Sequence, residues 1–187
     1  MKVVVYAISK NEEKFVNRWY ESMKEADEIY VLDTGSSDNT VKLLKENKVV
    51  VKVKEIKPWR FDTARNESLS MVPEDTDICV CTDLDEVFEP GWRKALERSW
   101  KKDTNRLRYI FNWSLENNKP VISFYGEKIH SRNNYKWTHP VHEVLTYSGT
   151  QENKITTDEI TINHYPDKTK SRSSYLPLLE LSVKEDP

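Results

Sequence analysis

The chain has 187 residues, 37% of them hydrophobic and 32% charged, with a formal net charge of −2. This length fits one domain with a sizeable core, and the composition is typical of a globular protein. The nearly balanced charge gives no electrostatic basis for binding nucleic acid, and no apolar run approaches the ~20 residues that span a bilayer.

Strands and helices alternate through the first hundred residues. Apolar runs predict strands at residues 3–8, 29–32, 49–53 and 76–82. Helical spacing of apolar residues predicts a helix capped by Asn11, a second helix opening at residues 36–38, and others at 62–71 and 90–100. This alternation predicts an α/β fold with a Rossmann-like, mainly parallel central sheet flanked by helices.

The second half changes character. Residues 107–113, 121–129 and 155–162 predict strands, and we expect a smaller, partly antiparallel portion of the sheet here. Residues 169–183 predict a helix, although Pro177 inside it leaves its start open. We expect most aromatic residues of this half to lie in the core, and one or two to be available to stack on an acceptor sugar. These aromatic residues are Tyr109, Phe111, Trp113, Phe124, Tyr125, Tyr135 and Trp137.

The two cysteines lie close together in the fourth predicted strand. Cys79 and Cys81 are two positions apart, a spacing that does not form an ordinary disulfide. A cysteine-containing zinc site would need further ligands, and the His139–His142 spacing alone lacks a third one. We therefore expect two core thiols in a cytoplasmic protein, with the inner face of the membrane as an alternative location.

An acidic turn follows the fourth predicted strand directly. It reads Asp83-Leu84-Asp85-Glu86, and ligands of open α/β sheets bind beyond the carboxyl ends of the strands. Two carboxylates one residue apart can hold Mg²⁺ or Mn²⁺, which keep open positions for substrate phosphates. The turn predicts a metal–diphosphate site, and a solvated surface turn is the alternative interpretation.

The sequence lacks the glycine-rich motifs that bind phosphate groups. The chain has four glycines and neither a G-x-G-x-x-G motif nor a P-loop. This argues against a dinucleotide-dependent dehydrogenase and a P-loop kinase. A nucleotide diphosphate bound by this sheet would need the Asp-x-Asp turn and its metal to neutralise its charge.

Four motifs in order make a specific resemblance, which spans roughly residues 1–165. The motifs are Ser9–Glu13, Val31–Thr40, Phe61–Asn66 and Thr82–Glu86. Together they resemble the family 2 glycosyltransferases of GT-A fold. The resemblance implies a metal-dependent, inverting transfer from a nucleotide-sugar, with a UDP-sugar as the default donor and Mn²⁺ or Mg²⁺ as the cofactor. The acceptor stays open among glycans, lipid-linked sugars, peptides and small molecules.

The resemblance also implies roles for individual residues. It implies a nucleoside pocket lined by Ser9, Asn11, Glu12 and Asp33. Arg65 would lie near the base or the diphosphate. Asp83 would face the ribose or the metal, and Asp85 would bind the metal.

Two later segments extend the resemblance. Trp137–Glu143 resembles the segment ending in Val-His-Glu in a subset of the family. An inverting transferase needs a general base and a carboxylate is the usual one, so Glu143 is our candidate, with a salt-bridged structural Glu as the alternative. Ile162–Pro166 resembles the segment with a late His that completes the metal or diphosphate site, so His164 is a candidate ligand; a half-buried, hydrogen-bonded His is the alternative.

The expected organisation is a transferase domain over residues 1–165 and a helical segment over 166–187 leading into a further region. Within the domain, residues 1–100 would bind the nucleotide-sugar and residues 101–165 the acceptor. Three other functions stay open. They are a catalytically silent nucleotide-sugar-binding or interaction module, a sugar nucleotidyltransferase, and a phosphatase of the haloacid dehalogenase type with Asp83 as its nucleophile.

Overall fold

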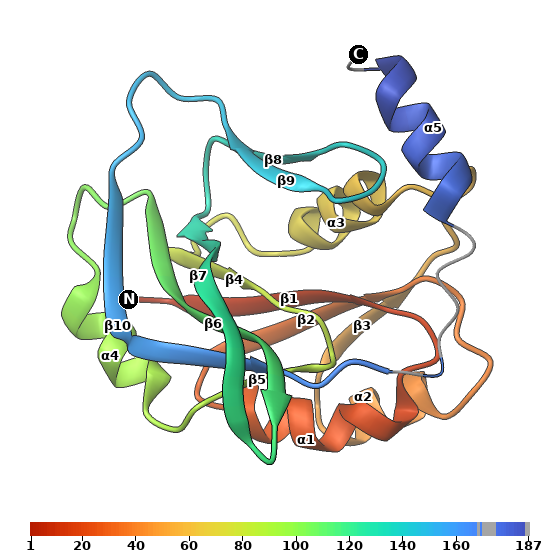
Figure 1. Ribbon diagram of the computed structural model, residues 1–187, viewed down its shortest axis with the longest axis horizontal. Helices are drawn as coiled ribbons and strands as arrows, with labels where there is room; N and C mark the ends of the chain where they lie inside the picture. Colours follow the sequence, from red (N-terminus) through yellow and green to blue (C-terminus); the bar gives the residue numbers. More distant parts are fainter. Residues whose placement is uncertain (168, 170–174, 186–187) are drawn as a thin grey trace.

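An eight-stranded mixed sheet forms the centre of the protein in the computed structural model (Figure 1), which describes residues 1–167, 169 and 175–185. The strand order is β3-β2-β1-β4-β7-β6-β10-β5. The first four strands are parallel, as the alternation of strands and helices predicted. Their bounds are β1 Val3–Ser9, β2 Glu28–Asp33, β3 Val50–Val53 and β4 Ile78–Cys81.

The second half completes the sheet with a long hairpin and a returning strand. β6 (Arg106–Glu116) and β7 (Lys119–Ser131) are antiparallel to each other, and β7 is antiparallel to β4. β10 (Lys154–His164) runs parallel to β6. The predicted antiparallel portion is therefore confirmed, and it begins where β7 joins β4.

Helices and a small second sheet cover the two faces of the central sheet (Figure 1). One face of β1, with Val3, Val5 and Ala7, packs in a core shared with α1, α2 and α4. The other face, with Val4 and Tyr6, packs against α3 and the small sheet. The covering elements are α1 Glu13–Met23, α2 Thr40–Glu46, α3 Phe61–Ser70, α4 Trp92–Ser99, β8 Tyr135–Thr138 and β9 Val144–Tyr147.

Three of the predicted helix starts were wrong. α2 begins at Thr40 rather than at residues 36–38, because Asn39 is the residue that precedes its first turn. Asn11 does not cap α1, because it has a left-handed backbone (φ 54°) and its side-chain oxygen accepts a hydrogen bond from the Ser37 amide instead. α4 begins two residues after Pro90, because Gly91 turns the chain with φ 87° immediately before the first helical residue.

Three short strands were missed: β8, β9 and the edge strand β5 (Glu86–Phe88), which pairs with β10. The last helix, α5, spans Leu176–Glu185, and residues 170–174 of the predicted helix lie outside the described residues. Glu185 on α5 forms an ion pair with Arg60 at the start of α3 (2.6 Å). No helix in the described part of the chain is long and apolar enough to cross a membrane.

Candidate active site

The sheet topology brings four of the predicted site residues to one edge. β1, β2 and β4 are parallel, and β10 has the same direction because two antiparallel pairings separate it from β4 and its own pairing with β6 is parallel. The carboxyl ends of these strands therefore face the same way. They carry Ser9, Asp33, the turn that begins at Asp83, and His164.

Asp33 holds the turn after β2 together. Its carboxylate accepts hydrogen bonds from the Ser9 hydroxyl (2.8 Å), from the Gly35 and Ser36 amides (3.1 and 2.8 Å) and from the Ser36 hydroxyl (2.5 Å). Gly35 has φ 107°, a conformation that glycine adopts without strain. Ser9 and Asp33 are both buried, so in this structure they stabilise the loop from beneath the protein surface.

Asn11 and Glu12 connect this loop to the start of α1. The Asn11 amide donates to the Ser36 hydroxyl (2.8 Å), and its side-chain oxygen accepts from the Ser37 amide (2.8 Å). The Glu12 amide donates to the Thr40 hydroxyl (2.7 Å). The loops after β1 and β2 thus form one hydrogen-bonded unit, and Asn11 lies exposed at its surface.

Arg65 joins two of the predicted acidic residues on the α3 side of the sheet. Its Nε donates to Glu143 Oε1 (2.5 Å), and its terminal nitrogen donates to Asp83 Oδ1 (2.8 Å). The guanidinium also lies over the ring of Trp137, 5.1 Å from its centroid. Arg65 is only 5% exposed, so it contacts both carboxylates from the interior of the protein.

Lys128 pairs with the same acidic turn from β7. Its Nζ contacts Glu86 Oε1 (2.5 Å) and Asp83 Oδ2 (3.3 Å), while the Asp83 amide donates to Glu86 Oε2 (3.0 Å). Burial alone would raise the pKa of Asp83, but the charges of Arg65 and Lys128 outweigh it and hold that pKa well below its usual range. Burial raises the pKa of Glu86 to about 7 despite Lys128, and the charge of Asp83 acts in the same direction.

Sequence reasoning missed Lys128 and the structural role of Glu86. Glu86 belongs to the acidic turn, so its position was available, but its partner is 42 residues further along the chain. Lys128 reaches the turn only because β7 pairs antiparallel with β4. No local pattern in the sequence marks that pairing.

Asp85 and His164 form the other half of the acidic edge. Asp85 Oδ2 lies 3.3 Å from His164 Nε2, and the Tyr165 amide donates to the Asp85 carbonyl (2.8 Å). His164 Nδ1 lies 3.0 Å from the Trp113 carbonyl, which can only accept, so Nδ1 carries a proton. Burial lowers the pKa of His164, but its hydrogen bonds to Asp85 and Trp113 outweigh that effect and raise it.

These two side chains fit a divalent cation. A protonated His164 donates its Nε2–H to Asp85, whereas in neutral His164, with the proton on Nδ1, the Nε2 lone pair and the Asp85 carboxylate could both bind a cation. A histidine that ligates a metal typically donates its other N–H to a carbonyl or carboxylate, as His164 does here. The described residues contain no group of three or more potential ligands, so an ion held by Asp85 and His164 would need water and substrate phosphates at its remaining positions.

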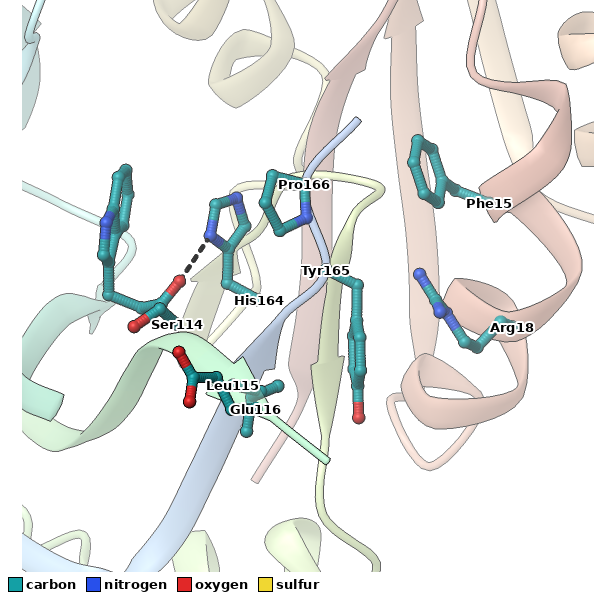
Figure 2. A pocket seen from close by; sticks show the side chains of 9 residues that line it. Phe15, Arg18, Ser114, Leu115, Glu116, His164, Tyr165 and Pro166 are labelled. Atoms are coloured by element: carbon teal, nitrogen blue, oxygen red, sulfur yellow. Dashed lines mark hydrogen bonds between the residues drawn. The ribbon is translucent and has the colours of Figure 1, made fainter. Parts of the chain in front are cut away.

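Two cavities lie beside the acidic edge. The larger, about 540 Å³, lies between α1 and the end of β10, and Figure 2 shows His164, Tyr165 and Pro166 on one side of it and Phe15 and Arg18 on the other. The smaller, about 390 Å³, has Arg65, Asp83, Glu86, Lys128 and Glu143 in its lining. Trp113 borders both cavities, Asp83 of the turn after β4 lines the smaller one, and Asp85 of the same turn contacts His164 in the lining of the larger one.

Comparison with protein families gives one match. A family model described as glycosyl transferase family 2 matches residues 4–164 of this chain. No curated protein has significant sequence similarity to it.

Two solved structures illustrate the similarity of fold. The first is glucosyl-3-phosphoglycerate synthase from Mycobacterium tuberculosis in complex with Mn²⁺, UDP and glucosyl-3-phosphoglycerate, at 19% identity and a TM-score of 0.52, covering 70% of this chain and 57% of that one. The second is S. aureus TarS 1-349 in complex with UDP-GlcNAc, at 13% identity and a TM-score of 0.62, covering 99% of this chain and 66% of that one. The chain thus spans less than two thirds of the length of either protein, and the likeness confirms the GT-A-type fold.

Proposed function

The chain belongs to glycosyl transferase family 2, and from this membership and the site geometry we propose that it transfers a sugar from a UDP-sugar to an acceptor hydroxyl with inversion. One observation carries the proposal: the turn after β4 presents its two carboxylates to different partners. Asp85 faces His164, which lines the larger cavity, and Asp83 pairs with Arg65, which lines the smaller one together with Glu143. Donor and acceptor would meet at this turn.

The donor would bind along the carboxyl edge of the sheet, within residues 1–100. The loops after β1 and β2, joined through Asn11 and Asp33, provide a rigid rim at which a nucleoside could lie. UDP and Mn²⁺ are bound in the mycobacterial structure, and UDP-GlcNAc in the S. aureus one. These ligands support a uridine nucleotide as the donor.

Asp85 and His164 would hold the divalent ion, Mn²⁺ or Mg²⁺. Such an ion neutralises the negative charge that develops on a leaving diphosphate. The Trp113 carbonyl keeps His164 in the tautomer that points Nε2 at Asp85. Asp83 is already paired with Arg65 and Lys128, so we place it toward the ribose or sugar of the donor.

Glu143 would act as the general base. Its side chain is only 12% exposed, lines the smaller cavity and forms an ion pair with Arg65. In the transfer, the acceptor oxygen forms a bond to the anomeric carbon, the bond from that carbon to the diphosphate oxygen breaks, and the acceptor proton passes to Glu143. One displacement of this kind inverts the anomeric centre.

Calorimetric titration of UDP and of GDP, each with and without Mn²⁺, tests the proposal. We expect binding of UDP that depends on the metal, and slow hydrolysis of the matching UDP-sugar. Binding of neither nucleotide would contradict the donor site. Binding without any turnover, across a range of acceptors, would favour a silent nucleotide-sugar-binding module instead.

A further inference from the structure

Two aromatic side chains present their rings to the smaller cavity without being buried in the core. In the β6–β7 hairpin Phe111 pairs with Phe124, and Trp113 lies two positions further along β6, at a shift in the strand register. Phe124 is 50% exposed and Trp113 is 42% exposed, and both line the cavity. Their ring centroids are 6.4 Å apart and each also lies near Phe111, so they form one aromatic wall.

The charged groups of the same cavity are already paired with one another. Arg65 is bound to Glu143 and Asp83, and Lys128 to Asp83 and Glu86. The third cation of the lining, Arg106, forms an ion pair with Glu127 (3.0 Å) and donates to the Leu145 carbonyl (2.7 Å).

The lining therefore has no cation to offer an anionic acceptor. Its described residues include four carboxylates and three cations, and each of these cations is already bound to a carboxylate. A phosphate or carboxylate group entering this cavity would have to displace one of these carboxylates from its cation. Carboxylate oxygens on the lining, in contrast, can accept hydrogen bonds from hydroxyl groups.

From this combination we infer that the acceptor is an uncharged sugar ring that stacks on Phe124 and Trp113. The inference rests on the proposed function, because it places the reacting hydroxyl beside Glu143 in the same cavity. A pyranose ring has an apolar C–H face for the aromatic wall and hydroxyls for the carboxylates. A lipid chain would need a continuous apolar groove, whereas this lining carries seven charged side chains.

The test compares acceptors and variants in a transfer assay with the UDP-sugar that the protein hydrolyses. The probes are methyl glycosides of glucose, galactose, mannose and N-acetylglucosamine, each with its 6-phosphate counterpart. We expect transfer to at least one neutral ring and a clear preference for it over its phosphate. Preference for the phosphates, or donor hydrolysis with no transfer to any neutral ring, would overturn the inference.

Phe124→Ala should raise the KM of the preferred neutral acceptor about tenfold, the order expected for one lost aromatic contact, and Phe124→Tyr should restore it. Ile122→Ala is the matched control, because Ile122 is 52% exposed in the same hairpin but does not line the cavity. Its acceptor KM should equal that of the parent protein.

Measuring UDP affinity in every variant separates the two hypotheses. If the parent protein does not bind UDP, the proposed function and this inference fail together. If UDP binds normally but Phe124→Ala leaves the acceptor KM unchanged, only the aromatic acceptor site is wrong.

Discussion

Arg65 and Glu143 are 78 residues apart in the sequence, yet the Arg65 Nε and a Glu143 carboxylate oxygen lie 2.5 Å apart. The contact fixes the loop between β8 and β9 to helix α3, and the same guanidinium reaches Asp83 at the end of β4. One buried cation therefore sets the position of the proposed base relative to the proposed donor site. Such an arrangement would hold a loop residue as precisely as the proposed general base requires.

Glu143→Gln should keep UDP binding and lower turnover. The amide retains the size of the carboxylate but cannot take the acceptor proton, and loss of a general base typically costs about 10²–10⁴-fold in rate. Transfer rates and calorimetric UDP affinities of the variant and of Glu159→Gln, an exposed control, check this. A rate within a few-fold of the parent would mean that Glu143 is a structural ion-pair residue only.

Asp85→Asn should weaken UDP binding in the presence of Mn²⁺ by about tenfold or more, the order found for disturbed metal sites. His164→Gln should act in the same direction, because it removes the other proposed ligand. Both effects should disappear when the titration is repeated with EDTA in place of Mn²⁺. Glu46→Gln on the exposed surface of α2 serves as the control. Equal metal dependence in all four proteins would place the ion elsewhere.

The parallel strands and the polar residues at their carboxyl ends could be predicted because the signals are local. β1, β2 and β4 are short apolar runs followed directly by polar residues, and their parallel arrangement brings Asp33 and Asp83 to one edge. β5 was not predicted because its first residue, Glu86, belongs to the acidic turn. β8 and β9 have four residues each, too few for alternation to distinguish them from a loop.

The partners of the site residues could not be predicted, because they come from parts of the chain that are distant in the sequence. The candidate roles of Arg65 and Glu143 came from the family resemblance, but their mutual contact depends on how the β8–β9 sheet packs over α3. The exposure of residues 121–125 could not be predicted either. Their sequence resembles that of a core strand, yet in the β6–β7 hairpin these residues are exposed to solvent. An apolar run alone does not reveal whether another layer covers it.

Lys128→Met should destabilise the protein, because it leaves the 3%-exposed Glu86 carboxylate and Asp83 without their shared cation. Breaking a buried ion pair from one side costs about 3–5 kcal/mol, and we expect about 2–4 kcal/mol here because Lys128 is partly exposed. Urea unfolding measures the change, with Lys119→Met at the exposed hairpin tip as the control. Adding Glu86→Gln should recover part of the loss, and a double variant as unstable as the sum of the single ones would contradict the pairing.

His130 should make the protein less stable in mild acid. It is completely buried between β1, β7 and β8. Its Nδ1–H donates to the Ser131 carbonyl (2.7 Å) and its Nε2 accepts from the Tyr6 hydroxyl (2.8 Å). The Tyr6 hydroxyl in turn accepts from the Trp137 indole (2.9 Å). Protonating Nε2 would break this chain of hydrogen bonds, and burial lowers the pKa of His130 to about 3.

The sign of the effect follows from the two pKa values. In the unfolded chain His130 has a pKa of about 6.5, so between that pH and about 3 the unfolded state binds a proton that the folded state does not. The free energy of unfolding should therefore fall as the pH falls, by about 2 kcal/mol between pH 7 and pH 5 from this group. Urea unfolding of the parent and of His130→Gln between pH 7 and pH 5 measures the contribution of His130 to the free energy of unfolding. Glu86, whose raised pKa acts in the opposite direction, contributes equally to both proteins and cancels in their difference. The gap between the two curves should narrow toward acid pH, and parallel curves would show that His130 is not the group responsible.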